Sequence, residues 1–290
     1  GKGFRLGMLP FITSYTCLFR PRQKERTRTL FFSSQPLYFT GRGPASTDFA
    51  WMSHSRTMRP ISWLLGRGPK RYTLHAPLSP LQKALMAVGG SVMSLADPKR
   101  GDLVAAVGET TGELALHSMH RRMSAHAVGQ SILADRPRIG PATMDVAKML
   151  RTLPPGTFGH DYAIFMSRHG FSAADRADVR FVDDPNLAYV MQRYREVHDF
   201  WHVLCGMPPT VAGEVGLKWF EAVQTGLPMC FLSAFVGPLR LGPADQGLLA
   251  TQYVPWALRV GSQCEDLLCV KYEELVETPT DDVRRMLRIE

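Results

Sequence analysis

Apolar positions along the chain recur mostly at helical spacing. The clearest stripe consists of Leu81, Leu85, Val88, Val92 and Leu95, which repeat every three or four residues. Ser79 at the N-cap and Gln82 three residues later predict a capping box, and Pro80 stands at the first helical position, where proline is tolerated. The stripe ends at Asp97-Pro98, so we expect a helix between these two signals.

Helical spacing continues through the rest of the chain, and strand-like alternation never persists for more than a few residues. Further helices are predicted at 102–123, 124–134, 143–152 and 157–169, from Pro185 to Gly206, from Thr210 to about Thr225, at 243–260 and at 264–277, with a charged tail to Glu290. The glycines at 108 and 112 lack the spacing and the following lysine of a phosphate loop, so they indicate a fixed turn between helices. The predicted fold class is therefore all-α, a single multi-helix domain.

Positive charge is concentrated at the start of the chain. Residues 1–71 contain thirteen Lys and Arg residues against two acids, whereas residues 72–290 contain 21 Lys and Arg residues against 24 acids. A basic segment rich in Arg, Ser and Thr is typical of an organelle transit sequence, so we predict a mitochondrial, disordered leader over 1–71 and a folded domain over 72–290. A plain basic tail, or upstream sequence that is not native, is the alternative. The mildly acidic body argues against a nucleic-acid-binding surface.

The cysteines and the apolar content limit the class of protein further. The five cysteines form no C-x-x-C pair and no even disulfide framework, which is typical of buried thiols in a reducing compartment. Hydrophobic residues make up 45% of the chain, enough for a sizeable core. No run reaches the ~18 apolar residues that a membrane-spanning helix needs.

One segment combines residue types that bind metal ions. His198 and His202 are four residues apart, so a helix places them about 40° apart on one face, with Asp199 about 100° from His198. Gly206 ends this helix, and the next helix carries Glu214 in its first turn. Two histidines and a carboxylate from the following helix predict a three-ligand metal site with an open position. Asp199 is either a fourth ligand or the group that transfers a proton.

Other interpretations of these residues are open. A histidine pair at this spacing is often solvated or satisfied within a core. Cys205 lies one turn beyond His202 and is either an extra ligand or a core residue. A zinc protease would have Glu after the first histidine, and Asp199 is one methylene shorter, which argues against that activity.

Residues near the motif suggest where a substrate would bind. Arg195, Tyr194 and Lys218 have helical spacings that place them near the site, where a cation would orient a carboxylate. A structural salt link or a solvated position is the alternative for each. The uncharged run at 227–236, which includes Phe231, is too short to span a bilayer. It suits an apolar tunnel, a membrane interface or a buried core helix.

The segment His198-Asp199-x-x-His202-x11-Glu214 resembles the signature of the mitochondrial ubiquinone (coenzyme Q) biosynthesis protein family that carries an HDxxH-x11-E zinc motif. Blocks on both sides of it are similar to the family as well: Leu78–Lys83, Gly108–Gly112, Arg180–Asp184, Lys218–Ala222, Gly226–Met229 and Gly237–Leu241. The resemblance covers about residues 72–275, fades over the last fifteen residues and leaves the leader uncovered.

The resemblance implies an all-helical protein that holds Zn²⁺ and lies peripherally on the matrix side of the mitochondrial inner membrane. It also implies C1 decarboxylation of 4-hydroxy-3-methoxy-5-polyprenylbenzoate to 2-methoxy-6-polyprenylphenol, and organisation of the multi-enzyme complex that makes coenzyme Q. In that activity, a metal on His198, His202 and Glu214 would act as a Lewis acid on a substrate oxygen. Asp199 would be a ligand or the proton-transfer group.

Two other classes of protein remain as hypotheses. The first is a non-catalytic scaffold that carries lipid intermediates and whose zinc is structural, and a closed four-ligand site that includes Asp199 would favour it. The second is a non-haem iron oxygenase, because two histidines and one carboxylate also suit Fe²⁺. Metal analysis and the number of protein ligands discriminate among these hypotheses.

Overall fold

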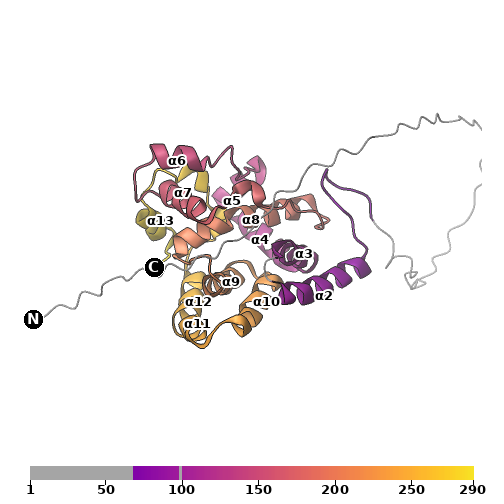
Figure 1. Ribbon diagram of the computed structural model, residues 1–290. Helices are drawn as coiled ribbons and strands as arrows, with labels where there is room; N and C mark the ends of the chain where they lie inside the picture. Colours follow the sequence, from indigo (N-terminus) through magenta and orange to yellow (C-terminus); the bar gives the residue numbers. More distant parts are fainter. Residues whose placement is uncertain (1–67, 98–99) are drawn as a thin grey trace, which may run out of the picture. The chain divides into compact units, whose positions relative to one another are not determined.

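The computed structural model describes residues 68–97 and 100–290, and within these ranges it contains helices but no β-strand (Figure 1). The α-helices are α2 (Pro80–Ala96), α3 (Gly101–Thr111), α4 (Glu113–Ala125), α5 (Ala127–Asp135), α6 (Val146–Thr152), α7 (Phe158–His169), α8 (Pro185–Cys205), α9 (Val211–Thr225), α10 (Pro228–Val236), α11 (Pro243–Leu248), α12 (Val254–Gln263) and α13 (Thr280–Leu287). Shorter helical turns are η1 (Ala173–Asp175), η2 (Gly237–Arg240), η3 (Leu249–Tyr253), η4 (Leu267–Cys269) and η5 (Tyr272–Glu274). The predicted all-α class is confirmed.

Helix α8 is the longest described helix, and nearly all of its side chains are buried. The Asp184 carboxylate caps its start by accepting hydrogen bonds from two backbone N–H groups of the first turn, and Pro185 follows at the first helical position. Gly206 ends the helix in the left-handed conformation, with φ at 64°, which glycine adopts without steric cost. Along its length α8 packs against α4, α5, α7, α9 and α13. Its buried aromatic side chains, such as Trp201, each contribute roughly 1.5–3 kcal/mol of transfer free energy.

A tight turn brings α9 back along the end of α8. Thr210 is the N-cap of α9, and its hydroxyl accepts a hydrogen bond from the backbone N–H of Gly213 at 3.2 Å. A Cβ on Gly213 would collide with the Pro208 carbonyl oxygen, so this close approach of turn and helix requires glycine. The turn therefore fixes the first turn of α9, which carries Glu214, beside the last turns of α8.

Helices α2 and α10 both pack against α3 (Figure 1). The predicted capping box of α2 is present, with hydrogen bonds in both directions between Ser79 and Gln82. The apolar stripe of α2, however, faces outward, and the exposed fractions of Leu85 and Val88 are 64% and 66%. Phe235 on α10 is exposed to a similar degree. The helix prediction for this segment is confirmed, and its apolar face remains unburied in the described residues.

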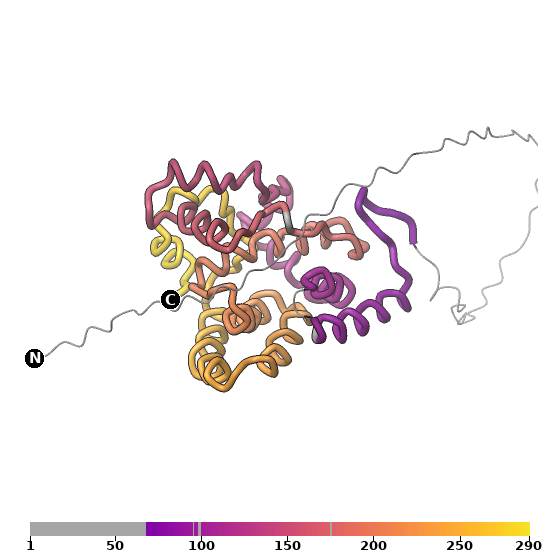
Figure 2. Tube along the Cα trace, viewed as in Figure 1, coloured from indigo at the N-terminus to yellow at the C-terminus, as the bar shows by residue number. Residues whose placement is uncertain are grey.

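The end of the chain differs from the sequence-based expectation. The helix predicted at 264–277 is wrong: this segment contains only the two short turns η4 and η5, and four successive residues from Leu267 to Val270 are buried, which one face of a helix cannot achieve. The predicted charged tail instead contains α13, whose Val283 and Leu287 are buried on one face. Figure 2 shows this yellow C-terminal segment beside α7, and α13 packs against α7 and α8.

The predicted leader lies outside the described residues up to position 67, so its boundary stays a prediction. The segment that precedes α2 is irregular and is tied to the chain before α8. The Tyr72 hydroxyl donates to the Val182 carbonyl at 2.9 Å, and a His75 ring nitrogen lies 3.1 Å from the Asp183 carboxylate. Across the described ranges, every helix is too short or too polar to cross a membrane.

Candidate metal centre

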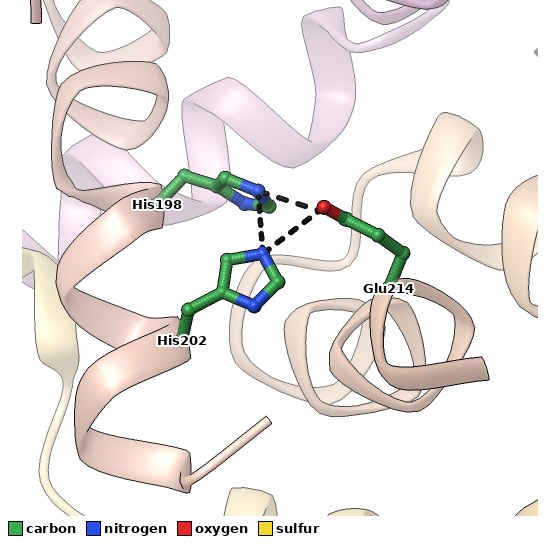
Figure 3. A group of neighbouring side chains, drawn as sticks. All are labelled: His198, His202 and Glu214. Atoms are coloured by element: carbon green, nitrogen blue, oxygen red, sulfur yellow. Dashed lines mark hydrogen bonds and ion pairs between the residues drawn. The ribbon is translucent and has the colours of Figure 1, made fainter. Parts of the chain in front are cut away.

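Three predicted ligands meet between α8 and α9 (Figure 3). The Nε2 atoms of His198 and His202 are 3.2 Å apart, and a Glu214 carboxylate oxygen lies 3.2 Å from His202 Nε2. The other carboxylate oxygen lies 3.8 Å from His198 Nε2. Ligands about 2.0–2.1 Å from a tetrahedral Zn²⁺ are roughly 3.3 Å from one another. The three side chains therefore have the spacing that one small cation requires.

The second ring nitrogen of each histidine is also engaged, which fixes the direction of the first. Nδ1 of His202 donates to the backbone carbonyl of Met207 at 2.9 Å, and a carbonyl can only accept. Nδ1 of His198 lies 2.5 Å from the Glu221 carboxylate and donates to it. In the neutral ring each Nε2 is consequently left with a free lone pair, and both face Glu214. Outer hydrogen bonds of this kind are typical of histidines that ligate metals.

Glu221 is fully buried and connects several groups behind His198. Its second carboxylate oxygen accepts hydrogen bonds from Lys218 at 2.6 Å and from the Tyr194 hydroxyl. Burial raises the pKa of Glu221, but the charges of Lys218 and His198 hold that pKa well below its usual range. Glu221 was not among the site residues predicted from the sequence. The signal was available, because positions 214, 218 and 221 share one face of α9.

The charges of the cluster match a cation-binding role. Burial raises the pKa of Glu214, but its hydrogen bond with His202 and the nearby positive charges lower it to about 2. Burial lowers the pKa of His202, but its interactions with Glu214 and Met207 raise it above the ordinary value. Burial and the charge of Lys218 lower the pKa of His198. Glu214 is thus an ionised ligand at neutral pH, and a bound cation would replace the proton that His202 favours.

Asp199, which follows His198, points to a different partner. Its Oδ1 accepts a hydrogen bond from the Arg176 guanidinium, and among the described residues its Oδ2 accepts none. Burial lowers the pKa of Arg176, while the charges of Asp199 and then Glu214 raise it. Burial raises the pKa of the buried Tyr162 most. The charge of Asp199 raises that pKa further, and the charge of Arg176 lowers it. Arg176 and Tyr162 had not been expected at the site from the sequence.

The predicted substrate residues fall into separate environments. Arg195 donates to the Glu109 carboxylate at 2.7 Å and to two backbone carbonyls, so its guanidinium is committed away from the ligand cluster. Lys218 is committed to Glu221 and Tyr194. Phe231 lies on α10 with 41% of its surface exposed. Cys205 does not contribute to the ligand cluster.

Helical folding and a cluster of two buried histidines and one half-buried carboxylate define an all-α protein with a candidate metal centre between two consecutive helices. The model of the family described as coenzyme Q (ubiquinone) biosynthesis protein Coq4 matches residues 72–290. The chain therefore belongs to the Coq4 family. The match reaches Glu290, which corrects the expectation that the resemblance fades over the last fifteen residues.

Named relatives agree with this assignment. The chain is 47% identical over 224 residues to the human protein "Ubiquinone biosynthesis protein COQ4 homolog, mitochondrial", covering 77% of this chain and 84% of the human one. It is 47% identical over 203 residues to the mitochondrial COQ4 protein of Laccaria bicolor, covering 70% of this chain and 68% of the fungal one.

A solved structure shares the fold. The crystal structure of a putative ubiquinone biosynthesis protein from Nostoc punctiforme aligns with a TM-score of 0.58 and 22% identity. The alignment covers 71% of this chain and 97% of the Nostoc chain. At this identity the likeness supports the helical architecture alone.

Proposed function

We propose that this protein catalyses metal-dependent C1 decarboxylation of 4-hydroxy-3-methoxy-5-polyprenylbenzoate to 2-methoxy-6-polyprenylphenol in ubiquinone biosynthesis. One observation carries the proposal: His198, His202 and Glu214 converge, while Asp199 is held by Arg176 rather than joining them. Three protein ligands leave a coordination position for a substrate, as in catalytic metal sites. A closed four-ligand site would have favoured a scaffold with structural zinc.

Zn²⁺ is the proposed ion, held by the two Nε2 atoms and the Glu214 carboxylate. Bound there, it would supply Lewis-acid stabilisation of negative charge on a substrate oxygen. Glu221 and the Met207 carbonyl would keep the two imidazoles aimed at the ion through their Nδ1 hydrogen bonds.

The reaction breaks the bond between ring carbon C1 and the carboxyl carbon. The bonding electron pair stays on C1, the carboxyl group leaves as carbon dioxide, and C1 takes up one proton. We propose Asp199 for this proton transfer rather than for a fourth ligand position, because its Oδ1 is occupied by Arg176 and its Oδ2 has no partner among the described residues. After each turnover Asp199 would take up a new proton from solvent.

The polyprenyl tail requires the protein to work at a membrane surface. Each isoprene unit has about five carbons, and each buried methylene contributes roughly 0.8 kcal/mol of partitioning free energy. We propose a peripheral location on the matrix side of the mitochondrial inner membrane, with other coenzyme Q biosynthesis enzymes as partners in a complex. The mitochondrial names of the relatives support the compartment, and the exposed apolar side chains of α2 and α10 support membrane contact. Phe231 is among these side chains and is proposed to contact the tail.

The same donor set supports one alternative, a non-haem Fe²⁺ oxygenase. Turnover of a short-tailed substrate by metal-depleted protein, reloaded with either Zn²⁺ or Fe²⁺ in the presence or absence of oxygen, tests both proposals. Decarboxylation by the zinc form without oxygen supports the lyase. Activity only with iron and oxygen supports the oxygenase, and inactivity of every form supports a scaffold.

A further inference from the structure

Arg176 brings a positive charge to the edge of the metal centre from a segment distant in sequence. It lies in the irregular chain between η1 and α8, and its guanidinium donates to Asp199, the residue next to His198. The charge of Glu214 also acts on Arg176. Arg176 is therefore held at the residue next to a ligand, on the side of α8 that Asp199 faces.

The guanidinium of Arg176 is largely uncommitted. Arginine has five N–H donors, and the described residues accept a hydrogen bond from only one nitrogen of Arg176. Its side chain is 35% exposed. Arg195 differs, because its side chain is 9% exposed and three acceptors surround it. Among Arg176, Arg195 and Lys218, only Arg176 combines a contact beside the centre with open donors.

We propose that Arg176 is the carboxylate-binding residue of this site, which would take the carboxylate of an aromatic acid, and that Asp199 positions it. This inference rests on the proposed function and names how its substrate is recognised. A guanidinium suits the role because its planar donors match the two oxygens of a carboxylate. With Asp199 occupying Nη2, the remaining donors are available to the ligand.

The chemistry specifies how loss of Arg176 would affect catalysis. The substrate carboxylate is an anion, whereas the departing carbon dioxide is neutral, so the contact is strongest before the bond breaks. An interaction of this kind contributes to substrate binding and does not selectively stabilise the transition state. Removing it should therefore raise KM more than it lowers kcat. A merely structural ion pair would not discriminate between an acid and its ester.

Equilibrium binding to the zinc-loaded protein tests the inference. The probes are a short-tailed 4-hydroxy-3-methoxy-5-prenylbenzoate and its methyl ester, which lacks the negative charge. Wild-type protein should bind the acid about 10- to 100-fold more tightly than the ester, as expected for a hydrogen bond to a charged group. Arg176→Met should abolish this preference and leave the affinity for the ester unchanged. Arg176→Lys should retain part of it, and Arg151→Met, which alters an exposed arginine of α6, should match wild type.

Three results would overturn the inference: equal binding of acid and ester by wild type, an undiminished preference in Arg176→Met, or equal losses for both ligands. An undiminished preference would place the carboxylate on the ion itself. If Arg176→Met does not fold, Arg176→Lys still tests the inference. Lysine lacks the planar donors of arginine, so an unaltered preference for the acid over the ester would contradict a carboxylate contact that depends on those donors. Turnover is measured separately, so a protein that prefers the acid through Arg176 but releases no carbon dioxide would refute the proposed reaction and not this binding role.

Discussion

The Glu221 carboxylate lies 2.5 Å from Nδ1 of His198 and 2.6 Å from the Lys218 ammonium, so one buried acid links a metal-binding imidazole to a buried cation. The histidine gains a fixed orientation from this contact. The lysine gains the counter-charge that its burial requires. Metal affinity and folding stability are thus coupled at one side chain, and they can be separated by mutation.

Glu221→Gln should lower metal affinity by about 10- to 100-fold, the usual effect of losing the outer partner of a ligating histidine. It should also lower the free energy of unfolding by about 3–5 kcal/mol, because Lys218 keeps its charge without a carboxylate. Competition titration with a chelating dye and denaturant unfolding measure the two effects. In the matched variant Glu221→Gln/Lys218→Met, stability should partly recover while metal affinity stays low. Unaltered metal affinity in Glu221→Gln would show that the contact with His198 is dispensable.

His202→Ala should lose stoichiometric metal, because two ligands from different helices hold an ion far more weakly than three. Since an ion that binds only the folded state stabilises it, the thermal midpoint should fall and should no longer respond to a chelator. Elemental analysis and thermal unfolding with and without chelator provide the measurements. His117→Ala, which alters an exposed histidine of α4, is the control and should retain both properties. Full metal content in His202→Ala would remove this residue from the ligand set.

Asp199→Asn is nearly isosteric and should keep the helix and most of the metal. Decarboxylation should nevertheless fall by about 10²- to 10⁴-fold, the usual share of a positioned acid or base. Metal content, partner pull-down and turnover should be measured on the same preparation. A scaffold with structural zinc makes the opposite forecast, namely joint loss of metal and of complex assembly with no activity to lose.

Leu85→Asp/Val88→Asp should weaken sedimentation of the protein with vesicles of anionic phospholipid by severalfold or more. Both positions are well exposed on the apolar face of α2, so the unfolding free energy should change little. The control is Leu114→Asp, at an 86% exposed position of α4 outside this face. Equal vesicle binding by the double variant and wild type would mean that α2 does not contact the membrane.

The thiols of Cys264 and Cys269 should react slowly with iodoacetamide at pH 8. Burial raises the pKa of each to about 12. The thiolate is the reactive form, so only about one molecule in 10⁴ is reactive at that pH, and the rate should rise tenfold per pH unit. Site-resolved mass spectrometry follows each residue. Rapid modification of either cysteine in the folded protein at pH 8 would contradict the raised pKa values.

Features of the fold and site could be predicted from the sequence where the interacting residues are close together along the chain. Ser79, Gln82 and the turn at Gly206 act within one helical turn, so these helix ends were predictable from local signals. His198 and His202 were predictable as neighbours because helical periodicity alone places them on one face. Glu214 could be predicted as the third ligand because the connection between its helix and the helix of the two histidines is short.

Contacts between distant segments could not be predicted in this way. Arg176 reaches Asp199 only because the chain before α8 folds over that helix, and Glu109 anchors this chain by accepting the backbone N–H groups of Arg180 and Phe181. No periodicity encodes such a contact. Helix α13 was missed for another reason: its high charge concealed the few apolar positions that dock it on α7 and α8.

Carboxyl-labelled substrate in heavy water distinguishes decarboxylation by proton transfer from its alternatives. Zinc-loaded protein would be incubated with a short-tailed 4-hydroxy-3-methoxybenzoate carrying ¹³C in its carboxyl group, and both products would be analysed by mass spectrometry. We expect one labelled carbon dioxide per phenol formed and one deuterium at C1 of that phenol, with neither product formed by metal-depleted protein. Retention of the label, or an oxygen atom at C1 in place of deuterium, would contradict metal-dependent decarboxylation by proton transfer.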